Sequence, residues 1–309
     1  MTLTQLEYIV AVDNHRHFAE AAAACFVTQP TLSMQIGKLE AELGVTIFDR
    51  SKKPVIPTEI GSAILARARV ILREAERLKQ EISDSKGSMS GELRMGIIPT
   101  LAPYLLPPLF RRLRHKYPQL QLSIRETITR ELVAELKHDR LDCALVVTPL
   151  KDASLNEEPL FYEELLVYVS PQNALHDKQY LLPRDIDPAQ LWLLEEGHCF
   201  RSQILNLCEL QKSSDPHFRY ETGNIESLRR MVDQSDGITI LPELAIQDFG
   251  PEQLKRVKRL AAPSPVREVS LVTHRNHIKT RLIRSLRNEI RSIIPPQMQE
   301  LKEKKIVEI

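Results

Sequence analysis

Two cysteines nine positions apart, Cys199 and Cys208, have very different neighbours in the sequence. Cys199 follows Gly197 and His198 and precedes Arg201 at the expected start of a helix. Positive side chains and free backbone N–H groups at such a position would stabilise a thiolate. Cys208 falls on an apolar helical face. We therefore expect Cys199 to be a reactive thiol, supported by His198 and Arg201, and Cys208 to be buried.

The segment between these cysteines has the pattern of a helix over Arg201 to Leu210. Nine helical positions advance the chain by about 13 Å, at about 1.5 Å per residue. A disulfide requires Cα atoms within about 7 Å of each other, so the two thiols could join only if the helix were lost. The spacing predicts that oxidation of this pair would change the conformation of the segment.

A different kind of site is predicted near the N-terminus, in an amphipathic helix that follows Thr28. Thr28 is a good N-cap, Pro30 is tolerated in the first turn, and Gly44 supplies a stop. A shorter Ala-rich helix, Phe18 to Cys25, precedes it, so the pair has helix-turn-helix proportions. The apolar face of the second helix is expected to comprise Leu32, Ile36, Leu39 and Leu43.

The polar positions of this helix and of a basic wing at 48–56 are suited to DNA. Hydroxyl and amide groups can hydrogen-bond to base edges or phosphates, and cations suit phosphates. An ordinary solvated helix pair is the alternative. The candidate DNA-binding residues are Thr28, Gln29, Pro30, Thr31, Ser33, Gln35, Lys38, Arg50, Lys52 and Lys53.

A long helical segment follows, with apolar residues at alternating spacings of four and three. Such an a/d seam predicts pairing with the same helix of a second chain, which would hold two recognition helices about one DNA turn apart. Packing of the stripe on its own domain is the alternative. The seam comprises Ile64, Ala68, Ile71, Ala75, Leu78 and Ile82.

Beyond a break at 87–91, strand-like and helical runs alternate, which indicates an α/β architecture with largely parallel sheets. We expect two lobes whose connections lie near Tyr162 and Pro265. Thr100 and Thr129 closely follow strand-like runs, and ligands gather beyond the carboxyl ends of such strands. Both could face one cleft; alternatively, Thr129 caps a helix and Thr100 belongs to a turn. The expected strands are 93–98, 120–125, 143–147, 165–170, 237–241 and 269–273, and the expected helices include 104–117 and 225–234.

The composition is that of a globular protein with two or three domains: 309 residues, 42% hydrophobic and 27% charged. A net charge of +1 does not by itself predict a nucleic-acid partner. The N-terminal residues lack a secretion signal, and no segment approaches the roughly 18 apolar residues of a membrane span, so we expect a cytoplasmic protein. Four cysteines make no structural disulfide framework, and we expect Cys25 and Cys143 to be small buried hydrophobes.

The N-terminal motifs resemble those of LysR-type transcriptional regulators: residues 28–33, 35–36, 38–40, 43–44, 47–50, Thr58 and Gly61. The resemblance implies a winged helix-turn-helix domain, all-α with a small wing, at 1–58 and a dimerising linker helix at 59–87. It further implies a two-lobed α/β effector domain of periplasmic-binding-protein type at 88–309. Lobe I would comprise 88–161 and 268–309, and lobe II 162–267. Double-stranded DNA, a homodimer or homotetramer and RNA polymerase are the implied partners.

A second set of motifs resembles the peroxide-sensing members of this family: 197–199, Arg201, Gln203, Cys208, 105–107, 141–143 and 237–239. The resemblance implies that hydrogen peroxide oxidises Cys199 to a sulfenic acid, which Cys208 then attacks to form a disulfide. It also implies that Thr100 and Thr129 orient the peroxide, and Arg267 is a further candidate cation. One departure is Ser202, where these regulators more often carry Asp.

Three other functions fit some of these residues. A LysR-type regulator could bind a small metabolite between the lobes, with both thiols incidental. A thiol peroxidase would use the same chemistry, although an enzyme needs no recognition helix, so we expect a protein that is not an enzyme and needs no cofactor. Zinc binding by Cys199, Cys208, His198 and His217 is a weaker alternative, because the cysteine spacing matches no standard zinc motif.

Overall fold

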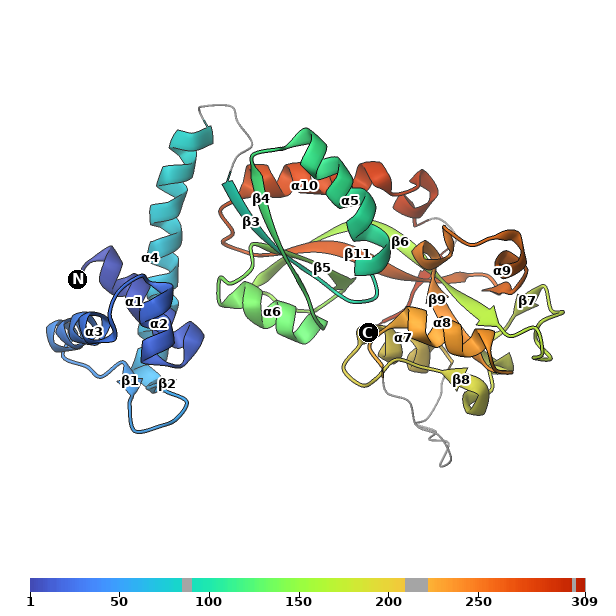
Figure 1. The fold of residues 1–309 in the computed structure, drawn as a ribbon, viewed down its shortest axis with the longest axis horizontal. Helices are drawn as coiled ribbons and strands as arrows, with labels where there is room; N and C mark the ends of the chain where they lie inside the picture. The colour runs from blue at the N-terminus through green and yellow to red at the C-terminus, as the bar shows by residue number, and fades with distance from the viewer. Residues whose placement is uncertain (85–90, 209–221, 302–303, 309) are drawn as a thin grey trace. The chain divides into compact units, whose positions relative to one another are not determined.

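The computed structural model describes residues 1–84, 91–208, 222–301 and 304–308 (Figure 1). The chain divides into an N-terminal unit, Met1–Ser88, and a regulatory unit that begins at Met89. Among the described residues, no helix is both long and apolar enough to cross a membrane. The finer domain boundaries inferred from the sequence stay predictions.

The N-terminal unit is a helix-turn-helix with a two-stranded wing. The predicted second helix is confirmed: Thr28 Oγ1 accepts a hydrogen bond from the N–H of Thr31 at 3.4 Å, and Gly44 ends the helix at a positive φ of 67°. The wing strands pair antiparallel and enclose the basic stretch. The elements are α1 (Leu3–His15), α2 (Phe18–Ala24), α3 (Gln29–Leu43), β1 (Phe48–Asp49), β2 (Ile56–Pro57) and α4 (Glu59–Asp84).

The apolar face predicted for α3 is correct over most of its length. Leu32, Ile36 and Leu39 are fully buried against α1 residues such as Ile9. The inclusion of Leu43 was wrong, since this side chain is 39% exposed. It occupies the last residue of α3, immediately before the Gly44 turn, and the buried positions of the helix end at Leu39.

The seam predicted for α4 divides into two parts. Ala68 is buried in the core of its own unit, and Ile64 packs against the same core, as in the alternative of packing within one chain. Ile71 and Leu78 are instead 39% and 65% exposed. The side chain of Ile82 lies outside the described ones. Exposed apolar residues farther along α4 thus remain available for a second chain.

The regulatory unit is built on a mixed sheet that spans two lobes. The predicted α/β architecture is confirmed, with strands in the order β4-β3-β5-β11-β6-β10-β7, and β12, β9 and β8 attached beside them. The strands are β3 (Gly91–Ile97), β4 (Leu120–Glu126), β5 (Cys143–Thr148), β6 (Leu155–Val169), β7 (Tyr180–Leu181), β8 (Leu191–Trp192), β9 (Ile238–Pro242), β10 (Val257–Leu260), β11 (Ser264–His274) and β12 (Lys304–Ile306).

The expectation of largely parallel sheets was only partly right. β3 runs parallel to β4 and β5, but β11 pairs antiparallel with both β5 and β6. β6 and β11 are the two strands that cross between the lobes, near the predicted Tyr162 and Pro265. One strand leaves lobe I and the other returns, so the two must run in opposite directions.

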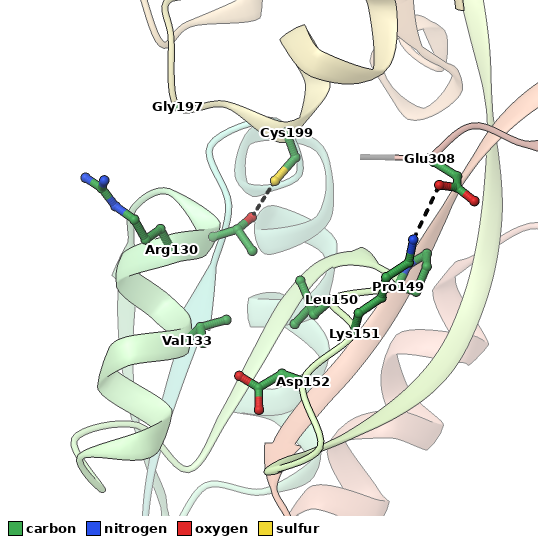
Figure 2. A pocket seen from close by; sticks show the side chains of 10 residues that line it. Arg130, Val133, Pro149, Leu150, Lys151, Asp152, Gly197, Cys199 and Glu308 are labelled. Atoms are coloured by element: carbon green, nitrogen blue, oxygen red, sulfur yellow. Dashed lines mark hydrogen bonds and ion pairs between the residues drawn. The ribbon is translucent and has the colours of Figure 1, made fainter. Parts of the chain in front are cut away.

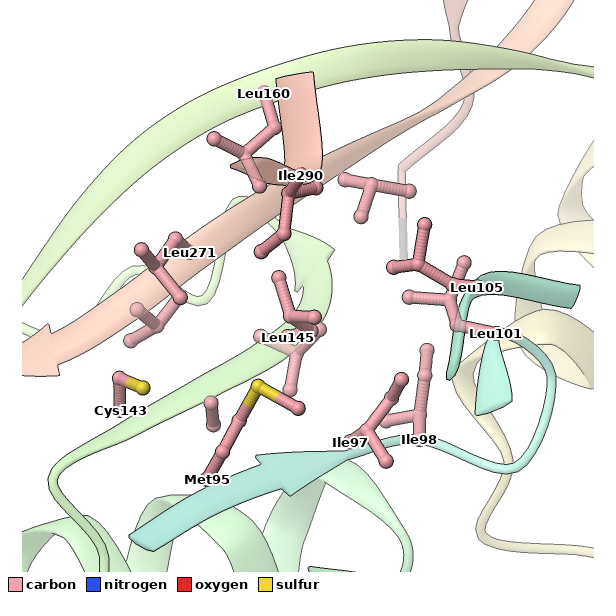
Figure 3. Close-up of a cluster of buried hydrophobic side chains, with 14 of the residues drawn as sticks. Met95, Ile97, Ile98, Leu101, Leu105, Cys143, Leu145, Leu160, Leu271 and Ile290 are labelled. Carbon is pink, nitrogen blue, oxygen red and sulfur yellow. The ribbon is translucent and has the colours of Figure 1, made fainter. Parts of the chain in front are cut away.

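Helices cover both faces of the lobe I sheet. Figure 1 shows α5 and α10 together on one face and α6 on the other. Buried side chains of these helices and of the sheet form the lobe I core, in which Met95, Leu145 and Leu271 of the strands converge with Ile290 of α10 (Figure 3). The α-helices described in the regulatory unit as a whole are α5 (Ala102–Lys116), α6 (Thr129–Lys137), α7 (Cys199–Leu207), α8 (Ile225–Asp233), α9 (Pro251–Lys255) and α10 (Thr280–Ile293).

Candidate redox site and DNA-binding surface

Helix α7 begins at Cys199 itself and ends at Leu207, with Cys208 as its C-cap. The predicted helix is therefore confirmed, although it starts two residues before the expected Arg201, and Leu210 lies outside the described residues. Gly197, at a positive φ of 99°, provides the turn that precedes the helix. The two cysteines thus lie at opposite ends of one helix, about 13 Å apart along its axis at about 1.5 Å per residue.

The thiol of Cys199 is half-buried and donates a hydrogen bond to Thr129 Oγ1, with the two atoms 3.2 Å apart (Figure 2). Thr129 is the first residue of α6, so the alternative that it caps this helix is wrong; Ile128 holds the N-cap position without a side-chain bond. The N-termini of α6 and α7 therefore meet at this sulfur. Each carries partial positive charge from its unpaired N–H groups.

A cavity of about 410 Å³ lies beside the Cys199 thiol. It is large enough for hydrogen peroxide, since a water molecule occupies about 30 Å³ in the liquid. At its rim, Lys151 Nζ and Glu308 Oε2 are 3.4 Å apart (Figure 2). The lining residues are Thr129, Arg130, Val133, Pro149, Leu150, Lys151, Asp152, Gly197, Cys199 and Glu308.

His198 and Arg201 make their described polar contacts away from the sulfur. His198 is buried, with Nε2 3.6 Å from a carboxylate oxygen of Glu195, and Arg201 Nη1 donates to the carbonyl oxygen of Leu194 at 2.7 Å. Both residues thereby hold the loop before α7 in place. Direct support of the thiol by either side chain stays a prediction.

Thr100 and Arg267 come together, but in a separate buried cluster. Arg267 donates from Nη1 to Thr100 Oγ1 at 2.8 Å and forms an ion pair with Glu163 at 2.7 Å. Neither Arg267 nor Glu163 has exposed surface. Arg267 also lies over the ring of Phe200, 5.0 Å from its centroid. Thr100 and Arg267 do not line the cavity beside Cys199, so this cavity is not the single cleft that was expected for both threonines.

Glu163 and Phe200 were not predicted as site residues. Glu163 carries a charge within the otherwise largely apolar run at 160–169, which was a signal for a buried cationic partner. Phe200 directly follows Cys199, and its contact with Arg267 links the first turn of α7 to the strands that cross between the lobes. No pattern in the sequence indicates that contact.

Cys208 lies in the lobe II core with Phe200 and Ile204. Burial raises the pKa of its thiol to about 11. Cys143 is fully buried in lobe I, as predicted, and burial raises its pKa as well, whereas Cys25 is only partly buried. All four cysteines are free thiols in this structure, and the segment between Cys199 and Cys208 is helical.

The described residues contain no group of three or more His, Cys, Asp and Glu side chains arranged to hold a metal ion. His217, which the zinc alternative requires, lies outside the described residues. The zinc alternative therefore has no structural support in the part of the chain that is described.

The predicted DNA-binding residues lie on α3 and the wing. Eight of them are exposed, and Ser33 and Gln35 are half-buried: the exposed ones are Thr28, Gln29, Pro30, Thr31, Lys38, Arg50, Lys52 and Lys53. Gln35 Oε1 accepts a bond from Gln5 Nε2 at 3.4 Å. This bond fixes the amide of Gln35 against α1.

Arg50 differs from the other wing cations because it is held by its own chain. Its Nη2 lies 2.9 Å from a carboxylate oxygen of Glu40, Nη1 donates to Ser33 Oγ at 3.4 Å, and the guanidinium lies over the Phe18 ring. Glu40 also accepts a bond from the N–H of Ile47 at 2.7 Å. Arg50 and Glu40 therefore fasten the wing to α3.

Two family models match the chain. Residues 3–62 match the bacterial regulatory helix-turn-helix protein of the lysR family, and residues 86–293 match the LysR substrate binding domain. The chain belongs to the LysR family of transcriptional regulators. The winged helix-turn-helix and the two-lobed effector domain expected from the sequence are thus those of this family.

Several LysR-family relatives share most of their length with this chain. A hydrogen peroxide-inducible genes activator of Haemophilus influenzae is 34% identical over 95% of this chain and 99% of its own. The transcriptional dual regulator OxyR of Escherichia coli K12 is 39% identical over 88% and 89%. A solved structure of a full-length OxyR variant from Pseudomonas aeruginosa covers 94% of this chain and 98% of its own, with a TM-score of 0.78 and 34% identity.

Proposed function

We propose that this LysR-family protein is a DNA-binding transcriptional regulator that senses hydrogen peroxide by oxidation of Cys199 and disulfide formation with Cys208. The observation that carries the proposal is the position of the two thiols on α7. Cys199, the first residue, contacts Thr129 beside a cavity, and Cys208, the C-cap, is buried in the lobe II core. The peroxide-inducible and OxyR relatives support the same signal.

The first chemical step is attack of the Cys199 thiolate on one peroxide oxygen. The sulfur–oxygen bond forms as the O–O bond breaks, which leaves a sulfenic acid and releases the other oxygen as water once it is protonated. The hydroxyl oxygen of Thr129 lies 3.2 Å from the sulfur, which supports a role for Thr129 in orienting the peroxide. We assign it the positioning role that the resemblance implies for Thr129.

In the second step the Cys208 thiolate attacks the sulfenic sulfur of Cys199. The disulfide bond forms, the sulfur–oxygen bond breaks, and hydroxide leaves as water after protonation. Both thiols are oxidised by two electrons in total, and the peroxide is reduced to two molecules of water. The step requires α7 to lose its helical form, because a helical separation of about 13 Å exceeds the roughly 7 Å limit for disulfide-bonded Cα atoms.

We further propose that the N-terminal unit binds double-stranded DNA as part of a homodimer or homotetramer. Exposed Ile71 and Leu78 on α4 offer apolar surface for pairing, and the exposed wing lysines Lys52 and Lys53 are suited to phosphate contacts. RNA polymerase is the expected partner at the promoter. A regulator of chromosomal genes acts where the DNA is, so we place it in the cytoplasm of a bacterium.

A metabolite-responsive LysR-type regulator is the second candidate. The observation in its favour is the cavity of about 410 Å³, which is larger than one peroxide molecule needs. A thiol peroxidase has less support, because the recognition helix, wing and α4 have no use in such an enzyme. Rapid multiple turnover of peroxide by the purified protein would favour the enzyme over the regulator.

The decisive experiment is a DNA footprint of the reduced and peroxide-treated protein beside the Cys199→Ser variant. We expect peroxide to change the wild-type footprint and to leave that of Cys199→Ser unchanged, while the variant still binds DNA. Cys208→Ser should still form the sulfenic acid at Cys199 but no disulfide, as read by peptide mass analysis. A wild-type footprint that does not change on peroxide treatment would refute the sensing function.

A further inference from the structure

The C-terminal segment Lys304–Glu308 lies along one of the strands that cross between the lobes. Its strand β12 pairs parallel with the start of β11, with Lys304 opposite Ser264 and Ile306 opposite Val266. The N–H of Val307 continues this pairing by donating to the carbonyl oxygen of Val266 at 2.9 Å. The segment is therefore fixed beside β11, immediately before Arg267.

The same segment is bonded to the redox helix α7. Gln203, fully buried near the middle of α7, donates from Nε2 to the carbonyl oxygen of Val307 at 2.8 Å. Among the described residues, Gln203 Oε1 has no hydrogen-bond partner, so the Nε2 bond alone holds this amide. One turn farther along α7, Asn206 Nδ2 donates to the carbonyl oxygen of Glu308 at 3.4 Å.

The side chains at the end of the segment reach two further sites. Val307 is buried in the lobe II core that also contains Cys208, Phe200 and Ile204. Glu308 lines the cavity beside Cys199 and forms an exposed ion pair with Lys151 of lobe I. Such exposed pairs contribute little stability, so the buried bond of Gln203 and the burial of Val307 are the contacts that matter.

We propose that Gln203 and the C-terminal strap, residues 304–308, are positioning elements that hold α7 in its helical form and thereby set the rate of disulfide closure. The inference rests on the proposed function of Cys199 and Cys208. Gln203 and Asn206 lie between the two cysteines, and both of their strap bonds must break when this segment leaves its helical form. These two bonds therefore oppose the second chemical step. The first step takes place at the sulfur of Cys199, which neither bond contacts.

A helix of nine residues supports this role physically. Isolated helices shorter than about 12 residues are marginal in water, so α7 depends on the contacts that surround it. Loss of the strap removes a buried hydrogen bond from the amide of Gln203 and leaves that group unsatisfied. The helical form of α7 loses stability as a result, and the form in which Cys208 can reach Cys199 becomes more populated.

The test uses the full-length protein and follows the two steps separately after addition of hydrogen peroxide. Sulfenic acid formation is measured by dimedone trapping in a Cys208→Ser background, and disulfide closure by quenched peptide mass analysis with both cysteines present. Val307→Asp places a carboxylate in the lobe II core and should displace the strap from it. Gln203→Leu removes the hydrogen bond between α7 and the strap. Lys305→Asp, which introduces the same residue at an exposed position of the strap, is the control.

We expect Val307→Asp and Gln203→Leu to accelerate disulfide closure about tenfold, the effect of losing about one buried hydrogen bond, with less than about twofold change in sulfenic acid formation. Lys305→Asp should match the wild type in both steps. A chain that ends at Leu301 removes the strap altogether and should also close faster. Wild-type-like fluorescence of Trp192, the single tryptophan, will show that the regulatory unit of each variant is folded.

Two outcomes separate the failure of this inference from the failure of the proposed function. Normal sulfenic acid formation with unchanged or slower closure in the strap variants and the truncated chain would overturn the strap alone. No sulfenic acid and no disulfide in the wild-type protein would overturn the function on which the inference rests.

Discussion

At the scale of single residues, Cys208 illustrates how burial separates two otherwise identical thiols. It lies in the lobe II core, and the cost of desolvating its thiolate raises its pKa to about 11. An ordinary cysteine has a pKa of about 8.5. Cys208 is therefore protonated at neutral pH while α7 is helical, and it becomes a nucleophile only after the helix opens.

Alkylation of the reduced protein with iodoacetamide should reflect this difference. We expect Cys208 to react much more slowly than Cys199 at pH 8, with its rate rising toward a midpoint near pH 11. In urea the midpoint should fall to about 8.5. Because the folded state retains the Cys208 proton longer, this thiol lowers the free energy of unfolding progressively as pH rises from about 8.5 to about 11. Peptide mass analysis gives both rates; equal labelling of the two cysteines at pH 8 would contradict the assignment.

The buried ion pair of Glu163 and Arg267 is a second contact whose contribution to stability depends on single residues. Glu163→Ala leaves a fully buried guanidinium without its charge partner, which should cost about 3–5 kcal/mol of stability. Urea unfolding followed by the fluorescence of Trp192, the single tryptophan, reports on this change. Glu158→Ala, which breaks an exposed ion pair with Arg287, is the control and should cost less than about 1 kcal/mol. If both variants lost the same free energy of unfolding, the buried pair would contribute no more to stability than the exposed one.

At the scale of elements, the wing contains cations of two kinds. Arg50 is fastened to Glu40 and Phe18, whereas Lys52 and Lys53 lie exposed in the loop between β1 and β2. We infer that the two lysines carry the phosphate contacts of the wing. Arg50 contributes by holding the wing in place against α3.

Replacing both wing lysines by alanine should weaken DNA binding and reduce its dependence on salt. The slope of log affinity against log salt is negative, and each lost phosphate contact brings it closer to zero by about 0.9. Fluorescence anisotropy with a duplex operator over a range of salt concentrations measures the slope. Lys255→Ala, an exposed lysine on α9, is the matched control and should leave the slope unchanged. An unchanged slope in the wing variant would show that Lys52 and Lys53 do not contact DNA phosphates in the wild-type protein.

Local sequence patterns predicted the elements that depend on local interactions. The cap at Thr28, the stop at Gly44 and the helix that contains Gln203 follow from capping, turn and periodicity rules. The antiparallel course of β11 was missed, because the direction of a strand depends on how the chain crosses between lobes. The place of Thr129 beside Cys199 could be expected only in outline, since it joins residues 70 positions apart.

Contacts between distant segments were the hardest to foresee. β12 is three residues long and carries no motif, and it becomes a strand only because residues 264–266 present an open edge to it. The ion pair of Glu163 with Arg267 joins residues 104 positions apart. Single-sequence patterns carry little information about partners at such distances, so the strap and the buried cluster emerged only from the fold.

At the scale of the whole molecule, assembly depends on the exposed part of α4. Ile71 and Leu78 stand exposed on this helix, while Ala68 is already used by the core of its own unit. The dimer contact should therefore centre on the later turns of α4 and spare the first ones.

Leu78→Asp should weaken dimerisation about tenfold or more, because a carboxylate would be buried at the seam without a partner. Sedimentation over a range of protein concentrations measures the dimer affinity. Leu254→Asp, the same substitution at an exposed leucine of α9, provides the control and should leave assembly unchanged. A Leu78→Asp protein that remains as dimeric as the control would place the contact elsewhere.

The shortness of α7 also has a consequence for response time. Helix–coil transitions in peptides take about 0.1–1 μs, whereas protein disulfides form over seconds or longer. Once its contacts are released, a helix of nine residues therefore unwinds and rewinds many times during a single bond-forming event. The unwinding motion itself therefore adds almost no lag. The delay between the arrival of an oxidant and the change in the regulator is governed by sulfur chemistry and by the fraction of molecules in which the strap has released α7.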